Sequence, residues 1–201
     1  LVDVLSRNFW EFSTFTQKLA RFDPLKKTEK FSAEINSGKL AGSKYEYHPG
    51  LFKVKLVLKG KVLFEAEEKP GSELVKDFTG GWLEKASFKY IAESGKFTGT
   101  SMNLKIAYST DADKNEFDIL AMKGTDLCLF ECKSGNVKAA DIDQLVALRG
   151  ILGKYTRLFL IACFKPRDIL IERLSEYNIK FILFSNIKGE LKKLPDNNPN
   201  I

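Results

Sequence analysis

Two acidic residues and a lysine in the middle of the chain have the types and the spacing that phosphodiester hydrolysis requires. Asp118 lies in one apolar segment, Glu131 and Lys133 lie in the next, and the turn 123–126 separates the two segments. Two neighbouring carboxylates favour a divalent cation such as Mg²⁺ or Mn²⁺, because the cation offsets their mutual repulsion. A nearby lysine can stabilise the negative charge that develops on a phosphate. These residues therefore indicate metal-assisted hydrolysis.

The spacing across the turn predicts that the two carboxylates face each other. Asp118 and Glu131 are equidistant from a turn midpoint between Gly124 and Thr125. In an antiparallel hairpin this register places both side chains on one face, with Cβ atoms about 5 Å apart. Side chains alternate along a strand, so Lys133 points to the same face as Glu131. We therefore expect the three side chains to converge.

Two polar residues on predicted helices are further candidates for this site. Glu84 shares a helical stripe with Phe88 and Ile91, and this stripe should turn toward the core. A glutamate in the first turn of a helix is also favoured by the helix dipole without any function. Gln144, on a helix predicted over 138–152, is either a surface residue or, if the helix crosses the carboxylate face of the sheet, a nucleic-acid contact. The sequence leaves both alternatives open for each residue.

The elements after residue 80 follow the order of a mixed sheet covered by helices. Hydrophobic periodicity predicts helices over 82–93, 138–152 and 167–177, and strands over 101–109, 115–123, 126–133, 157–164 and 179–185. This order is typical of an α/β (α+β) domain, in which helices flank a mixed β-sheet. The second and third strands carry Asp118 and Glu131.

The first 79 residues have a different pattern and are predicted to form an appendage to a domain over 80–201. An aromatic stripe predicts a helix over 1–22, and turn residues with few apolar side chains predict loops over 23–50. Alternation over 52–64 predicts a β-hairpin with one basic face. The basic residues are Lys53, Lys55 and Lys59. Such a face is either simply solvated or a track for phosphates.

The composition excludes several classes of protein. Hydrophobic residues make up 44% of the 201 residues and charged residues 29%, which is typical of a globular protein. The longest apolar run, 158–164, is too short to span a membrane, and the first thirty residues show no apolar segment with a small-residue cleavage site, so we expect a cytoplasmic protein without a membrane partner. Cys128, Cys132 and Cys163 lie in apolar stretches and are expected to be reduced core thiols. The formal net charge of +6 is compatible with a nucleic-acid partner.

Three motifs in this order resemble a known nuclease family. They are Gly80-Gly81-Trp82-Leu83-Glu84, Asn115-Glu116-Phe117-Asp118-Ile119-Leu120 and Phe130-Glu131-Cys132-Lys133-Ser134. Together they resemble the PD-(D/E)xK superfamily, and most closely the nuclease domain of CRISPR ancillary effectors that cyclic oligoadenylate activates. The resemblance covers about residues 80–165 and implies a restriction-endonuclease-like fold. It implies active-site positions at Glu84, Asp118, Glu131 and Lys133, with the three acids binding Mg²⁺ or Mn²⁺.

The same resemblance implies a metal-dependent endonuclease of antiviral defence that cleaves DNA or RNA as a homodimer. In that family cyclic tetra-adenylate binds an upstream sensor domain. Residues 1–79 contain neither a βαβ pattern nor a Gly-rich phosphate loop, so we expect this ligand to act only through a sensor absent from the chain. A restriction or junction-resolving endonuclease of the same superfamily and a non-catalytic nucleic-acid-binding module remain alternatives. Metal binding at the carboxylates separates the enzyme from the binding module.

Overall fold

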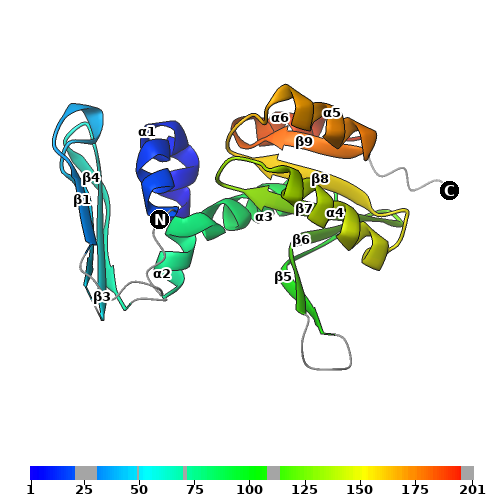
Figure 1. Ribbon diagram of the computed structural model, residues 1–201, viewed down its shortest axis with the longest axis horizontal. Helices are drawn as coiled ribbons and strands as arrows, with labels where there is room; N and C mark the ends of the chain where they lie inside the picture. The colour runs from blue at the N-terminus through cyan, green and yellow to red at the C-terminus, as the bar shows by residue number, and fades with distance from the viewer. Residues whose placement is uncertain (21–30, 49, 70–71, 108–113, 196–201) are drawn as a thin grey trace. The chain divides into compact units, whose positions relative to one another are not determined.

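The chain divides into two compact units, Leu1–Leu83 and Glu84–Ile201, and each unit contains one β-sheet (Figure 1). The computed structural model describes residues 1–20, 31–48, 50–69, 72–107 and 114–195. The division lies within a few residues of the predicted boundary between residues 79 and 80. Over the described ranges, no helix is long and apolar enough to cross a membrane.

The first unit combines a long helix with a four-stranded antiparallel sheet. Its elements are α1 (Val2–Ala20), β1 (Phe31–Ile35), η1 (Gly38–Leu40), β2 (Ser43–His48), β3 (Leu51–Leu58), β4 (Lys61–Glu68), α2 (Glu73–Lys76) and η2 (Asp77–Gly81). The strands lie in the order β1-β2-β3-β4, and Figure 1 shows α1 beside this sheet. Leu5, Phe9 and Phe12 of α1 are buried, as the predicted stripe requires.

The loops predicted over 23–50 are wrong where β1 and β2 lie and hold between these two strands, and the predicted hairpin is only half of the sheet. The hairpin itself is confirmed as β3 and β4, but β1 and β2 extend it on one side. The inward side chains of β2 are Ser43, Tyr45 and Tyr47, all buried. A serine and two tyrosines give a weak hydropathy alternation, so the strand did not stand out from its turn-rich surroundings.

A buried serine completes the hydrogen bonding of this sheet at an irregular point. The pairing of β3 with β4 shifts register between Leu56 and Val57, which is a β-bulge. The Ser43 hydroxyl accepts a hydrogen bond from the Val57 N–H at 2.8 Å and donates one to the Val57 carbonyl at 2.9 Å. Ser43 has no exposed surface. One side chain therefore satisfies both backbone groups that the bulge withdraws from the ladder.

The second unit is the mixed sheet that the sequence predicts. Its elements are α3 (Trp82–Glu93), β5 (Gly99–Ala107), β6 (Lys114–Lys123), β7 (Asp126–Lys133), α4 (Ala139–Leu152), β8 (Arg157–Ala162), α5 (Asp168–Glu176), β9 (Ile179–Leu183), η3 (Phe184–Asn186) and α6 (Ile187–Lys192). Strands β5, β6 and β7 are antiparallel, whereas β7, β8 and β9 are parallel. Figure 1 shows β5 and β9 at the two ends of the sheet. The mixed α+β class is confirmed.

Apolar side chains cover both faces of this sheet. On one face α4 and α5 pack on the strands through a cluster that includes Leu120, Leu129, Leu158, Leu160, Ile142, Leu145, Leu170 and Leu174. On the other face Phe130 stacks on Phe159, with ring centroids 4.4 Å apart. The three cysteines are free and buried, as predicted. The sheet is therefore a rigid support for polar groups at its edges.

We predict that Ser43→Ala lowers the free energy of unfolding by about 2 to 4 kcal/mol, because it leaves the buried Val57 N–H and carbonyl without partners. Urea unfolding of the full chain measures this loss. The control is Ser37→Ala, which removes an exposed hydroxyl without a capping hydrogen bond and should change stability by less than about 0.5 kcal/mol. Equal effects of the two substitutions would contradict the assignment.

Candidate active site

The β6–β7 hairpin brings the two predicted carboxylates close enough to repel each other. The strands pair from Ile119 with Phe130 to Lys123 with Asp126, around a two-residue turn. Gly124 begins this turn with a φ of 61°, which a tight hairpin requires at that position. The predicted turn midpoint is therefore confirmed. The pairing ends at Ile119 and Phe130, and one further step of the same register would set Asp118 opposite Glu131.

Asp118 is held in place by the backbone of the partner strand. Its Oδ2 atom accepts a hydrogen bond of 2.7 Å from the Cys132 N–H. Burial raises the pKa of the Asp118 carboxyl to about 7, and repulsion from Glu131 and Glu84 adds to the rise. The Cys132 N–H and the Lys133 ammonium act in the opposite direction but do not outweigh these effects. A free carboxylate at this position is therefore costly near neutral pH.

Lys133 supplies the positive charge beside the carboxylates. Its Nζ lies 2.8 Å from Oε1 of Glu131, whose side chain is only 5% exposed, and 3.5 Å from Oδ1 of Asp141. Burial acts to lower the pKa of Lys133, but attraction to Glu131, Asp141 and Asp118 outweighs it and raises the pKa. The ammonium group therefore stays protonated, with one acid on each side of it.

Asp141 is the residue of this site that the sequence analysis did not single out. It lies in the first turn of α4, where its Oδ2 accepts a hydrogen bond of 2.7 Å from the Lys138 N–H. Its other carboxylate oxygen reaches Lys133. An acid three residues into a helix is a common capping residue, and that pattern was visible in the sequence. Its link to Lys133 depends on tertiary structure, so sequence alone could not supply it.

The two candidates on helices, Glu84 and Gln144, differ in burial and in their relation to the site. Glu84 is half-buried in the first turn of α3 and contributes to the raised pKa of Asp118, so it lies within electrostatic reach of the site. Gln144 is exposed on α4. Within the residues that the structure describes, no group of three or more His, Cys, Asp or Glu side chains is placed to hold a metal ion. The site thus consists of two carboxylates with a lysine, and Glu84 as a third metal ligand stays a prediction.

The chemistry of these groups fits a hard divalent cation. Mg²⁺ commonly takes one or two protein carboxylates and fills its remaining positions with water and substrate phosphate. Asp118 and Glu131 offer such oxygens. Asp118 and Glu131 would hold such a cation, which would offset the free energy that burial and repulsion add to the ionised Asp118. Two carboxylates are therefore enough for a site of the magnesium type.

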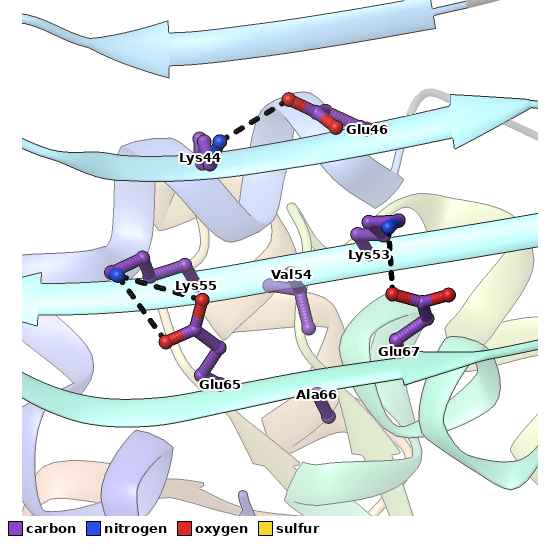
Figure 2. A pocket seen from close by; sticks show the side chains of 8 residues that line it. All are labelled: Lys44, Glu46, Lys53, Val54, Lys55, Glu65, Ala66 and Glu67. Carbon is purple, nitrogen blue, oxygen red and sulfur yellow. Dashed lines mark hydrogen bonds and ion pairs between the residues drawn. The ribbon is translucent and has the colours of Figure 1, made fainter.

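The predicted basic face of Lys53, Lys55 and Lys59 is not a surface of positive charge alone. Figure 2 shows Lys53 facing Glu67 and Lys55 facing Glu65 across β3 and β4, at 2.7 and 3.2 Å. Together with the Lys44–Glu46 pair they line a groove of about 380 Å³ with equal numbers of lysines and glutamates. Lys59 lies beyond β3 in the turn to β4.

This register explains why the prediction of a basic face is wrong. The lysines alternate within one strand, and the glutamates that neutralise them come from the neighbouring strand. A cross-strand partner becomes visible only when the pairing is known. Nucleic-acid binding by Lys53, Lys55, Lys59 and Gln144 stays a prediction. For the lysines, a continuous positive surface no longer supports it.

Two solved structures share the fold over 96% of the chain. Protein VC1899 from Vibrio cholerae superposes with a TM-score of 0.65 at 17% identity, over 52% of its own chain. Can2 from Sulfobacillus thermosulfidooxidans, solved in complex with cyclic tetra-adenylate, superposes with a TM-score of 0.66 at 14% identity, over 54% of its own chain. The present chain therefore spans about half the length of these proteins. No match was found among curated proteins.

The sequence identities to these two structures are too low to assign a family, but a match to a family model does assign one. The model of the Card1-like endonuclease domain matches residues 72–198. This range is more than half of the chain, and it contains Glu84, Asp118, Glu131 and Lys133. The resemblance to a CRISPR-associated nuclease is thereby confirmed, and the chain belongs to the Card1-like endonuclease domain family.

Proposed function

We propose that this chain is a metal-dependent endonuclease that hydrolyses phosphodiester bonds of DNA, with RNA as a second substrate. The observation that carries the proposal is the cluster at the end of the β6–β7 hairpin. The Asp118 carboxylate accepts a hydrogen bond from the Cys132 N–H of β7, and the Lys133 ammonium lies 2.8 Å from Glu131. Membership of an endonuclease family supports the hydrolytic reaction. Phosphodiester cleavage needs a cation, a positioned water and stabilisation of charge on the phosphate, and this cluster has groups for each.

Each side chain of the site has a distinct role in the proposed reaction. Asp118 and Glu131 would hold Mg²⁺ or Mn²⁺, which would supply Lewis-acid chemistry at the phosphate and an activated water. Lys133 donates hydrogen bonds to the phosphate oxygen on which charge develops, or to the attacking water. Asp141 and Glu131 keep the Lys133 ammonium between them. The Cys132 N–H fixes the Asp118 carboxylate so that one oxygen remains available to a cation.

We further propose that the chain works as a homodimer in the cytoplasm, as the effector part of a CRISPR-associated defence protein. The solved Can2 complex contains cyclic tetra-adenylate, and the present chain corresponds to 54% of the Can2 chain. We assign control by this nucleotide to a sensor outside these 201 residues. A ligand changes activity only when it binds two states unequally, so such a sensor must couple to how the nuclease units are placed.

We predict that Glu131→Gln and Asp118→Asn each reduce cleavage at least about a hundredfold, the scale seen when one group that stabilises developing charge is lost. Single-stranded DNA, supercoiled plasmid and RNA are incubated with Mg²⁺ or Mn²⁺, and initial rates are compared. Glu172→Gln is the matched control, because Glu172 is exposed on α5. Full activity of either site variant at saturating metal removes that residue from the mechanism.

We predict a pH dependence of stability from the raised pKa of Asp118. In the folded chain the carboxyl titrates at about 7, against an ordinary value of 3.8. The folded state therefore binds the proton more tightly, and the free energy of unfolding falls as the pH rises from about 4 to 7. Asp118→Asn keeps a hydrogen-bond acceptor for the Cys132 N–H and removes this loss, which is on the order of 4 kcal/mol.

Thermal unfolding in metal-free buffer between pH 4 and 8 measures this difference. The melting temperature of Asp118→Asn should exceed that of the wild type at pH 8 and approach it at pH 4. Mg²⁺ should raise the melting temperature of the wild type more at pH 8 than at pH 5, because the ligand must be deprotonated, and should have little effect on the variant. Parallel pH profiles of the two proteins would sink the assignment.

A further inference from the structure

We propose that three exposed basic side chains beside the carboxylate site bind the phosphate backbone of the substrate strand. They are Lys138, Lys165 and Arg167, here called the strand-end rim. The inference rests on the proposed function, since it names the residues that hold a nucleic acid at that site. The ligand is a polyphosphate backbone of any sequence, and the contacts are charge-assisted hydrogen bonds to phosphate oxygens.

The topology of the sheet places the rim next to the site. Strands β7 and β8 are parallel, and Lys133 pairs with Ala162, so both strands end at the same edge. The Cys163 N–H donates to the Lys133 carbonyl at 3.1 Å, which continues the pairing past the end of β8. Neighbouring strands lie about 4.8 Å apart. The segments that leave this edge lead directly to the three rim residues.

This edge is where ligands bind in sheets of this kind. In open sheets with parallel strands, the crevice outside the carboxyl ends of the strands is the usual binding position. Lys138 follows β7, and Lys165 and Arg167 follow β8. The opposite edge holds the β6–β7 turn and the segment before β8, which includes the exposed Lys154. Lys154 therefore has the same chemistry as the rim lysines on the side of the sheet away from the carboxylates.

The negative charge of the site must be offset before a polyanion can bind there. Glu131, Asp141 and Asp118 act on one lysine, and Glu84 lies within electrostatic reach of Asp118, so the site repels a polyanion unless cations offset it. The rim contributes three positive side chains. One of them, Lys165, lies 3.4 Å from Asp168, and both partners of this pair are well exposed. Exposed pairs exchange readily, so a phosphate can take the place of Asp168.

Helix stability does not account for two of these cations. Lys138 and Arg167 lie at the N-caps of α4 and α5. The helix dipole disfavours positive charge there, and a lysine or arginine side chain has no acceptor with which to cap an N–H group. Serine, threonine, aspartate or asparagine would stabilise both positions better. Both positions thus depart from the residue types that stabilise a helix N-terminus. Such departures are expected beside a functional site, where ligand binding determines the residue type.

The test measures how tightly the full chain binds a labelled single-stranded oligonucleotide in metal-free buffer. Fluorescence anisotropy reports the binding at salt concentrations from about 50 to 200 mM KCl. The variant Lys138→Gln/Lys165→Gln/Arg167→Gln should weaken binding by about five- to tenfold per lost contact at the lowest salt concentration. The slope of log K against log salt should become shallower by about 2, since each single-strand phosphate contact contributes about 0.7. Two oligonucleotides of unrelated sequence should be affected equally.

Two control variants keep this test sharp. Lys154→Gln removes one exposed charge from the opposite edge and should leave the salt slope unchanged. Lys138→Arg/Lys165→Arg keeps every charge and should bind like the wild type, with melting temperatures confirming that all variants are folded. Wild-type affinity and slope in the triple glutamine variant, or an equal loss in Lys154→Gln, would overturn the rim.

Failure of the rim and failure of the proposed function give different results. Glu131→Gln retains the rim, so it should bind the oligonucleotide at least as well as the wild type while cleavage is lost. A wild type that cleaves with Mg²⁺ or Mn²⁺, combined with a triple variant that binds normally, overturns the rim alone. A wild type that binds through the rim but cleaves no substrate with either metal overturns the proposed endonuclease instead.

Discussion

The burial of Asp118 beside Glu131 is the constraint around which the polar groups of the second unit are arranged. Burial, and then repulsion from Glu131, raise the pKa of Asp118 to about 7, so an ionised carboxyl here raises the free energy of the fold. The surrounding groups each offset part of it: the Cys132 N–H binds one carboxylate, and Lys133 binds the other. This compensation is incomplete, because the pKa of Asp118 stays raised. The site therefore lowers folding stability, as expected where function and packing compete.

The two units handle surface charge in opposite ways. In the groove of the first unit, Lys44, Lys53 and Lys55 each pair with a glutamate, so the charges drawn in Figure 2 balance and the pairs add little stability. At the carboxyl edge of the second sheet, acids cluster around one lysine and the exposed cations lie on the adjoining segments. The net charge of +6 therefore says little by itself. What matters for a polyanion is where the unpaired positive field lies.

The sequence predicted those features that local spacing determines. Helix α3 has the predicted bounds, and the symmetric turn at Gly124 and Thr125 was sufficient to pair β6 with β7. Features that arise from contacts between distant segments could not be predicted from the sequence. Strand β2 was missed because its inward residues are polar or amphipathic, and the neutral face of β3 was missed because its acids come from β4. The contact of Asp141 with Lys133 joins a helix to a strand and has no signature in either segment alone.

Burial makes the native thiols poor nucleophiles. It raises the pKa of Cys128 to about 11 and places the pKa values of Cys132 and Cys163 well above the ordinary range of a thiol. Maleimide reagents attack thiolates, so all three cysteines should be spared in the folded chain at neutral pH. A single cysteine introduced on an exposed surface can then carry a fluorophore or spin label without a cysteine-free background. The surroundings of any chosen surface position thus become accessible to labelling in a protein whose interior remains unaltered.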